Sequence, residues 1–142
     1  MKLQQQAINV NKLLSEIYKS EIKLSGIISK DESIRIDLQK LTPQQIQAIY
    51  NELLMILEKI MLKNRTPANL RKVDIIIKRF GLDGSKTKTL QDIGQFHNIS
   101  RERVRQLENK ILRNLRHPRN KKLLEDSITK AAIDILESDR LR

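Results

Sequence analysis

The chain has 142 residues, carries 28 Lys and Arg against 17 Asp and Glu, and contains no cysteine, so its formal charge is +11. A chain of this length forms one domain or two small ones, and the lack of cysteine excludes a disulfide scaffold and a thiolate metal site. No run of about 18 apolar residues is present, and the N-terminal Met-Lys-Leu-Gln-Gln-Gln does not form an apolar signal segment. We therefore expect a cytoplasmic protein without a membrane partner.

The positive charge is concentrated in the C-terminal half. Residues 1–62 hold 8 basic and 7 acidic side chains, whereas residues 63–142 hold 20 basic and 10 acidic ones. Residues 101–122 alone hold nine Lys or Arg and two Glu. Such a concentration attracts polyanions such as nucleic acid, but a charged run is also typical of a solvated helix face. Charge by itself leaves both interpretations open.

Residue spacing indicates an all-α protein. The chain holds only 4 Gly and 3 Pro, and most apolar residues recur at spacings of three and four. The first predicted helix spans residues 3–24. Its apolar stripe consists of Leu3, Ala7, Val10, Leu14, Ile17 and Leu24, widened by Leu13 and Tyr18. The pattern breaks from residue 26 to residue 40, where alternating Ile34, Ile36 and Leu38 favour a short strand or an extended linker.

The second predicted helix spans residues 43–63. Thr42 is a suitable N-cap, Pro43 suits the first helical position, Gln45 completes a capping box, and Leu41 can pack on Ile46. The apolar residues of this helix cover more than one face, so we expect it to pack on two neighbours, one of which is either another part of this chain or another chain. The segment 1–64 is therefore expected to be helical and to supply an interface for a partner protein or for a second copy.

The third predicted helix begins with the same cap-and-proline signature. Thr66 and Pro67 start it, and Gly81 ends it after an apolar face that consists of Leu70, Val73, Ile76, Ile77 and Phe80. A polar loop, residues 83–88, separates this helix from the next element.

Residues 89–101 have the pattern of a helix-turn-helix. Thr89 precedes a two-turn helix over residues 90–97, in which Asp92 is placed for a capping box. Asn98 tolerates the left-handed backbone that a tight turn requires, and Ser100 can cap a second helix. The small Gly94 allows a close crossing of the second helix. A short helix, a tight turn and a longer helix form the helix-turn-helix arrangement.

The second helix of this motif presents two different faces. Each residue advances about 100° around a helix axis, so Val104, Leu107, Ile111 and Leu115 fall within an arc of roughly 80° and form a buried stripe. The opposite face consists of Arg101, Glu102, Arg105, Gln106, Asn109 and Arg113. Arg can bind guanine O6 and N7, Gln can bind adenine, and Glu can accept from the cytosine amino group. The alternative to base reading is that this face is only solvated, because Glu is favoured in the first turn of any helix and Arg and Gln are good helix formers.

No constellation for catalysis or metal binding occurs. His97 and His117 lack a paired carboxylate or a second ligand at metal spacing, and there is no nucleophile–base pair or phosphate-binding glycine loop. We therefore expect no enzyme activity, no metal and no cofactor.

A last helix is predicted near residues 120–138, after Pro118 ends the second helix of the helix-turn-helix. Its apolar residues are Leu123, Leu124, Ile128, Ala131, Ala132, Ile135 and Leu136. We expect it to pack on the N-terminal helices or on a second chain. Residues 65–142 then form a DNA-binding domain with a C-terminal helix.

Three stretches carry a resemblance to a known family. They are Arg79-Phe80-Gly81-Leu82-Asp83-Gly84, Thr89-Leu90-Gln91-Asp92-Ile93-Gly94, and residues 100–118 with the run Arg-Glu-Arg-Val-Arg-Gln. Residues 69–126 thereby resemble region 4 of bacterial primary sigma factors. The resemblance implies a helix-turn-helix that reads the promoter −35 hexamer in the major groove and docks on the flap of the RNA polymerase β subunit. Nothing in residues 1–65 resembles sigma region 2.

The resemblance also implies roles for individual residues. It assigns base edges to Arg101, Glu102, Arg105 and Gln106. It assigns the DNA backbone to Arg71, Arg79, Thr89, the Leu90 amide, Arg103, Lys110 and Arg113. Of these, Lys110 and Arg113 match positions that face either DNA or neighbouring activators in the family.

These expectations combine into a small all-α transcription factor that binds −35-like double-stranded DNA, the polymerase flap, or both, and that acts as part of a split sigma factor. One alternative is a polymerase-binding antagonist that displaces the resident sigma region 4. A third class, a recombinase-like enzyme fragment, lacks a catalytic constellation.

Overall fold

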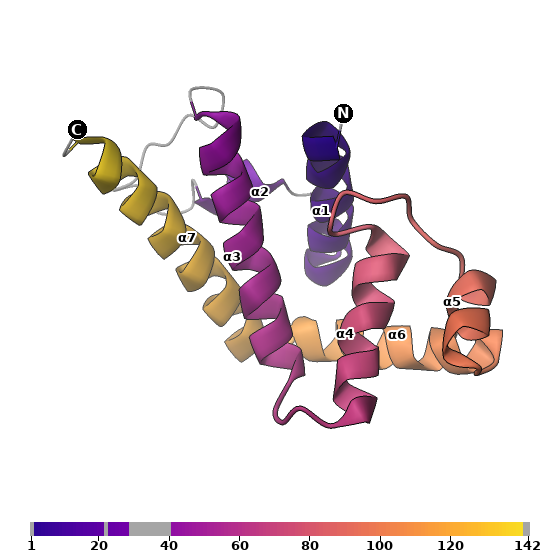
Figure 1. The fold of residues 1–142 in the computed structure, drawn as a ribbon. Helices are drawn as coiled ribbons and strands as arrows, with labels where there is room; N and C mark the ends of the chain where they lie inside the picture. Colours follow the sequence, from indigo (N-terminus) through magenta and orange to yellow (C-terminus); the bar gives the residue numbers. More distant parts are fainter. Residues whose placement is uncertain (1, 22, 29–40, 141–142) are drawn as a thin grey trace.

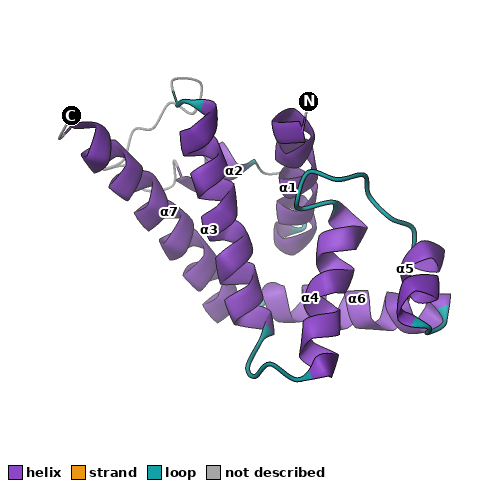
Figure 2. Cartoon of the chain, in the orientation of Figure 1, coloured by secondary structure: helices purple, strands orange, loops and turns teal. Residues whose placement is uncertain are grey.

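The computed structural model describes residues 2–21, 23–28 and 41–140, and these residues form helices and loops without a strand (Figures 1 and 2). The helices are α1 (Lys2–Tyr18), α2 (Leu24–Ile28), α3 (Pro43–Met61), α4 (Pro67–Phe80), α5 (Leu90–His97), α6 (Arg101–Leu115) and α7 (Pro118–Arg140). The predicted all-α class is thus confirmed. The alternating segment 34–38 lies outside the described residues, as do the side chains of Leu3 and Leu136.

The predicted caps set the bounds of α3 and α4. The Thr42 hydroxyl accepts from the Gln45 amide at 3.2 Å, and the Gln45 side chain accepts from the Thr42 amide at 2.9 Å, which completes the capping box. Thr66 caps α4 in the same way, with its hydroxyl 3.3 Å from the Asn69 amide. Gly81 ends α4 with a left-handed φ of 63°, a conformation that glycine adopts without steric cost.

The first helix ends earlier than its apolar pattern predicts. Helix α1 stops at Tyr18, because Lys19 adopts a left-handed φ of 53° and turns the chain. Leu24 belongs to the separate α2, and Gly26 lies inside that short helix rather than in a break. A single helix over residues 3–24 is therefore wrong. Of the predicted stripe, Val10, Leu13, Leu14, Ile17 and Leu24 are nonetheless buried, and one turn brings the two helices to the same core.

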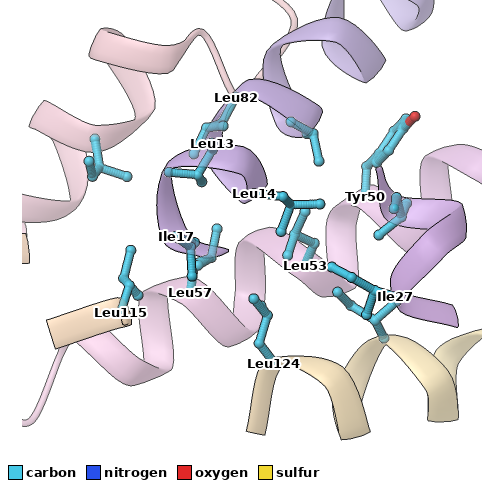
Figure 3. Close-up of a cluster of buried hydrophobic side chains, with 14 of the residues drawn as sticks. Leu13, Leu14, Ile17, Ile27, Tyr50, Leu53, Leu57, Leu82, Leu115 and Leu124 are labelled. Carbon is cyan, nitrogen blue, oxygen red and sulfur yellow. The ribbon is translucent and has the colours of Figure 1, made fainter. Parts of the chain in front are cut away.

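The main core joins the N-terminal helices to the C-terminal half (Figure 3). Leu13, Leu14 and Ile17 of α1 lie beside Leu53 and Leu57 of α3. Further members come from α2, α4, α6, α7 and the loop after α4, among them Ile27, Ile76, Leu82, Ile111, Leu115 and Leu124. Buried aliphatic side chains stabilise the fold by about 1.5–3 kcal/mol each relative to exposure, so this cluster is the principal source of stability.

Two buried polar side chains attach α1 to the loop after α4. Asn9 Nδ2 donates to the Gly81 carbonyl at 2.8 Å and to the Ser85 carbonyl at 3.3 Å. Gln6 Nε2 donates to the Leu82 carbonyl at 2.9 Å. Both side chains are almost completely buried, and such groups are costly to bury unless they are hydrogen-bonded. These bonds therefore fix where α1 docks on the loop.

Helix α3 finds its two predicted neighbours within the chain. It packs along α7 on one side and against α4 and α6 on the other. Helix α7 begins at Pro118 and reaches Arg140, two residues beyond the predicted helix at each end. It packs on α2 and α3, so the predicted packing on the N-terminal helices is found. Tyr18 connects α1 to α7 by donating its hydroxyl to Glu125 Oε1 at 2.6 Å.

A second, smaller core lies among α4, α5 and α6. It consists of Ile75, Ile93, Val104 and Leu107. Figure 1 shows α5 at one side of the molecule and α7 at the opposite side, with α6 running between them. None of the described helices is both long enough and apolar enough to cross a lipid bilayer.

Candidate nucleic-acid interface

Helices α5 and α6 form the predicted helix-turn-helix. The Thr89 hydroxyl accepts from the Asp92 amide at 3.1 Å, and the Asp92 carboxylate accepts from the Thr89 amide at 3.3 Å. Hydrogen bonding of the Asp92 carboxylate to the Thr89 side chain and backbone lowers the pKa of Asp92 below its usual value, so the carboxylate stays charged at neutral pH. Asn98 turns the chain with a left-handed φ of 56°, and Ser100 caps α6 by accepting from the Arg103 amide at 3.0 Å.

Gly94 lies at the closest approach between α5 and the turn. A Cβ atom at this position would lie 2.7 Å from the Ile99 carbonyl oxygen and 3.4 Å from the Arg101 amide nitrogen. The Ile99 amide also donates to the Gly94 carbonyl at 2.9 Å. The small residue is thus required by the backbone of the turn and of the first residue of α6, which is the close crossing that the sequence predicts.

The two faces of α6 are confirmed. Val104, Leu107, Ile111 and Leu115 are buried, as predicted. The side chains of the opposite face are exposed: Arg101, Glu102, Arg105, Gln106, Asn109 and Arg113. None of these six is covered by the described part of residues 1–64, so the face is open to solvent there.

The exposed face narrows toward the C-terminal end of α6. Leu112 lies at nearly the same angle around the helix as Arg101 and Arg105, yet it is only 6 % exposed and belongs to the main core. Helix α1 packs against α6 in this core. Only the N-terminal half of α6 is therefore free over the full width of its polar face.

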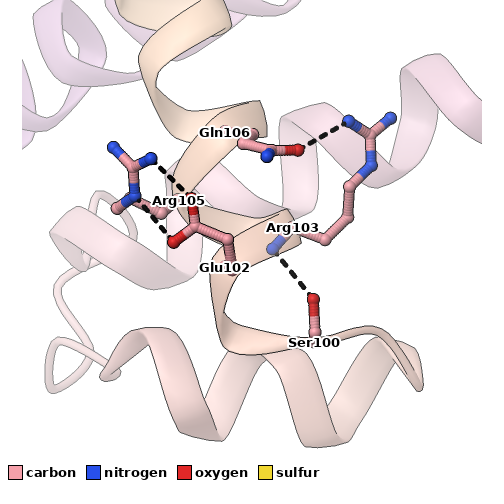
Figure 4. Close-up of polar contacts among 5 residues, drawn as sticks. All are labelled: Ser100, Glu102, Arg103, Arg105 and Gln106. Atoms are coloured by element: carbon pink, nitrogen blue, oxygen red, sulfur yellow. Dashed lines mark hydrogen bonds and ion pairs between the residues drawn. The ribbon is translucent and has the colours of Figure 1, made fainter.

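Glu102 and Arg105 form a bidentate pair on this face (Figure 4). Arg105 donates from Nε to Glu102 Oε2 at 2.9 Å and from Nη2 to Oε1 at 2.5 Å. The hydrogen bond from Arg105 holds the pKa of Glu102 below its usual value, and the same bond raises the pKa of Arg105. A lowered carboxyl pKa means that the pair is intact at neutral pH and is lost only as the pH falls through that lowered value.

A second contact lies on the other side of the helix in Figure 4. Arg103 Nη1 donates to Gln106 Oε1 at 3.4 Å, a long and exposed hydrogen bond. The four base-edge candidates thus come together within the first two turns of α6, next to the cap formed by Ser100. Short helical spacing and a well-defined helix start are enough to explain this arrangement.

The backbone candidates lie in different surroundings. Arg79 Nε lies 3.2 Å from Glu108 Oε1, and its Nη1 donates to the Lys88 carbonyl at 3.3 Å, so this side chain already links α4, α6 and the loop before α5. The Nε atom of Arg71 is buried without a hydrogen-bond partner in the described part of the chain. Thr89 is exposed, and Leu90 is half-buried in the first turn of α5, where backbone N–H groups lack intrahelical acceptors.

Lys110 and Arg113 lie further along α6. Both side chains are exposed, and both line a groove between the end of α3, the start of α4 and the C-terminal half of α6. Arg103 is exposed as well. The structure therefore brings Arg101 to Gln106 together, sets Lys110 and Arg113 beyond them, and places Arg71 and Arg79 on α4.

A cluster of side chains on α4 and α5 was not predicted from the sequence. His97 Nε2 lies 2.7 Å from Asp74 Oδ2, so the expectation that His97 has no carboxylate partner is wrong. Lys78 Nζ lies 3.0 Å from the same Asp74 oxygen and 2.9 Å from the centre of the Phe96 ring, which is 69 % exposed. Asp74 and His97 are 23 residues apart, so only the packing of α4 on α5 brings them together. Among the described residues, no group of three or more side chains has the makeup of a metal site.

Comparison with known proteins agrees with this geometry. The family model described as Sigma-70, region 4 matches residues 69–117, which span most of α4 together with α5 and α6. RNA polymerase sigma factor SigA of Nostoc sp. is 40% identical over 111 residues, an alignment that covers 75% of this chain and 27% of that protein. RNA polymerase sigma factor SigA1 of Synechococcus elongatus and SigA of Microcystis aeruginosa are each 48% identical over 58 residues, which cover 41% of this chain and 14% of each relative.

The extent of these matches differs between relatives. The chain spans about a quarter of the Nostoc protein and about a seventh of the other two. Residues 69–142 make up little more than half of this chain, so an alignment over 75% of it includes part of the segment before residue 69. No solved structure matches the chain. The motif, the capped helix-turn-helix and the family match agree: residues 69–117 are a sigma-70 region 4 module, joined in this chain to helices α1, α2, α3 and α7.

Proposed function

We propose that this protein is a helical transcription factor whose region 4 module binds −35-like promoter DNA with α6 in the major groove and binds the β flap of RNA polymerase, as part of a split sigma factor. The observation that carries this proposal is the exposed polar face of the N-terminal half of α6, with Arg101, Glu102, Arg105 and Gln106. Helix-turn-helix proteins contact base edges with this part of their second helix.

Arg105 is the strongest candidate for a guanine reader. Glu102 occupies the edge of its guanidinium group formed by Nε and Nη2, which leaves Nη1 and one Nη2 proton available. Those donors suit guanine O6 and N7, and bidentate Arg–guanine pairs are the commonest specific contact in the major groove. Each Glu102 oxygen keeps a second lone pair, so the carboxylate can also accept from a cytosine amino group.

The remaining candidates would hold the DNA backbone. Arg103, Lys110 and Arg113 are exposed on α6, and Thr89 and the Leu90 amide lie at the start of α5. Phosphate contacts of this kind set the orientation of the protein on the duplex and carry no direct sequence information. Arg71 and Arg79 would act from α4, and Arg79 would do so from its position beside Glu108.

Fluorescence anisotropy with labelled duplexes tests DNA reading. We expect the full chain to bind a −35 hexamer duplex more tightly than a scrambled duplex of equal length, and we expect Q106A to reduce that difference. Equal affinity for the two duplexes would contradict base reading. Thermal melting of the variant, followed by circular dichroism, serves as the control for folding.

Co-elution with core RNA polymerase tests the second half of the proposal. A factor that directs transcription co-elutes with the core enzyme and supports run-off transcription from a −35 promoter. An antagonist also co-elutes, but it lowers transcription by the resident sigma factor and keeps its effect when Arg105 is replaced by Ala. Failure to co-elute would contradict both roles at the polymerase.

Residues 1–64 are proposed to contact either a partner protein or a second copy of the chain. Met55 on α3 is 62 % exposed and Ile8 on α1 is 50 % exposed, and such large apolar side chains on a surface suit protein contacts. Sedimentation of the purified chain at increasing concentration separates the two cases. A dimer that dissociates in M55E indicates a second copy, and a monomer at every concentration leaves a partner protein as the occupant.

A further inference from the structure

A basic groove continues along α6 beyond the residues proposed to read bases. It has a volume of about 510 Å³ and lies between the end of α3, the start of α4 and the C-terminal half of α6. Four of its lining residues are cationic: Lys63, Lys72, Lys110 and Arg113. None of the described residues that line it is acidic. Lys63 and Lys72 have no role in the assignments made above.

Several cations outside this groove are paired with carboxylates. Lys78 pairs with Asp74, Arg79 with Glu108, and Arg116 with Glu16. In the described part of the chain, by contrast, no carboxylate pairs with the four groove cations. Cations held near one another without anions raise the local potential, and a bound polyanion relieves their mutual repulsion.

The loop that carries Lys63 is held against α4. Asn69 Nδ2 donates to the Asn64 side-chain oxygen at 2.8 Å and to the Asn64 carbonyl at 3.1 Å. These two bonds tie the residue after Lys63 to the first turn of α4, one turn before Lys72. The end of α3 is thereby kept at the groove, so Lys63 and Lys72 belong to one surface.

The position of the groove relative to the reading face suits a DNA strand. Arg113 follows Arg105 by eight residues, which is about 12 Å along the helix axis. When the N-terminal half of a second helix contacts bases, its C-terminal half runs toward the phosphates at the edge of the groove. Lys63 and Lys72 extend the line of positive charge from that point onto the loop after α3 and onto α4.

We propose that Lys63 and Lys72 form, with Lys110 and Arg113, a second phosphate-binding surface that holds the backbone of the same duplex. This inference rests on the proposed function. Lys63 lies before the matched residues 69–117, so the N-terminal segment takes part in DNA binding. Lysine acts there as a compact point charge, which suits phosphate contacts that do not depend on sequence.

The test compares the double variant K63A/K72A with the wild-type full chain in salt titrations of duplex binding. We expect weaker binding to −35 and scrambled duplexes by the same factor, with an unchanged ratio between them. We also expect the slope of log K against log salt to become shallower by about 0.9 for each lost phosphate contact. K130A removes an exposed charge from α7 and serves as the matched control, with affinity and slope unchanged.

Two outcomes would overturn the inference. One is a double variant that keeps wild-type affinity and slope while its circular dichroism and melting temperature remain normal. The other is a variant that keeps DNA affinity but no longer co-elutes with core polymerase, which would make the groove a protein-binding surface. Wild-type protein that binds no DNA would instead refute the proposed function itself, so the two failures are distinguishable.

Discussion

Arg105 illustrates how a neighbouring side chain can position a residue that is proposed to read bases. Glu102 lies one helical turn before it and binds one edge of its guanidinium group through two hydrogen bonds. The planar fork has a fixed geometry, so holding one edge also directs the other. A long side chain otherwise loses rotamer freedom when it binds, and a partner already in place reduces that loss. Glu102 is therefore a positioning residue for Arg105 as well as a candidate base contact.

A double-mutant cycle on Glu102 and Arg105 tests this coupling. We expect R105A to lose discrimination at one base pair of the hexamer by on the order of tenfold. E102A should lose part of the discrimination at the same base pair. The double variant should lose no more discrimination there than R105A does. The measurement is binding to a panel of duplexes with each base pair substituted in turn.

R113A provides the comparison, because the loss of a phosphate contact is expected to lower the affinity for all duplexes by the same factor. If E102A lowers the discrimination only at a different base pair, without coupling to Arg105, then Glu102 reads DNA by itself and does not position Arg105. The comparison is made near neutral pH, where the lowered pKa of Glu102 keeps its carboxylate charged.

At the scale of the elements, the turn between α5 and α6 depends on backbone approach more than on side chains. A Cβ atom at residue 94 would lie only 2.7 Å from the Ile99 carbonyl oxygen, which is too close for a side chain. Helix propensity favours Ala over Gly by about 1 kcal/mol, but contact with a backbone atom cannot be relieved by a rotamer change. The cost of the steric clash in G94A is therefore expected to exceed the gain in helix propensity.

We accordingly expect G94A to destabilise the protein by about 1–3 kcal/mol and to weaken DNA binding by tilting α6. Urea denaturation measures the free energy of unfolding, and anisotropy measures binding. Q95A, at an exposed position of the same helix, is the control and should be nearly neutral. A G94A variant as stable as wild type would show that the turn can open without cost.

The docking of α1 depends on hydrogen bonds inside the core. Asn9, which is buried, donates to the Gly81 and Ser85 carbonyls. We expect N9A to cost about 1–3 kcal/mol, because it removes both of these hydrogen bonds between α1 and the loop after α4. Chemical denaturation measures the loss, and Q4A on the exposed side of α1 is the control. A neutral N9A would mean that α1 docks through its apolar stripe alone.

At the scale of the whole molecule, charge and packing are arranged on different parts of the surface. The main core is formed by both halves of the chain, while the excess of positive charge lies after residue 62. The polar face of α6 and the basic groove are both on this basic half. Long-range attraction then brings a polyanion to the same side as the proposed reading face.

Salt dependence tests this arrangement as a whole. We expect the affinity for duplex DNA to fall steeply between 50 and 200 mM salt, since each neutralised phosphate contributes a slope of about −0.9 in log K against log salt. Equilibrium titrations over that range measure the slope. A flat response would point to a protein as the main partner of the basic half.

Local signals in the sequence determined much of this protein. Thr42, Thr66, Thr89 and Ser100 begin their helices as predicted, because a cap depends on side chains within three residues of the backbone they bind. The stripe and the exposed face of α6 follow from helical periodicity for the same reason. The family match was likewise visible in the Arg-Glu-Arg-Val-Arg-Gln run.

Only the tertiary structure decided the contacts between segments distant in the chain. In the folded chain α1 ends at Tyr18, and Leu112 is buried in the main core. His97 pairs with Asp74, and Arg79 pairs with Glu108. Lys63 and Lys110 line the same groove. None of these follows from spacing, because each depends on how two helices cross. Crossing geometry is set by the packing of many side chains at once, whereas caps and periodicity are set within a turn or two of one helix.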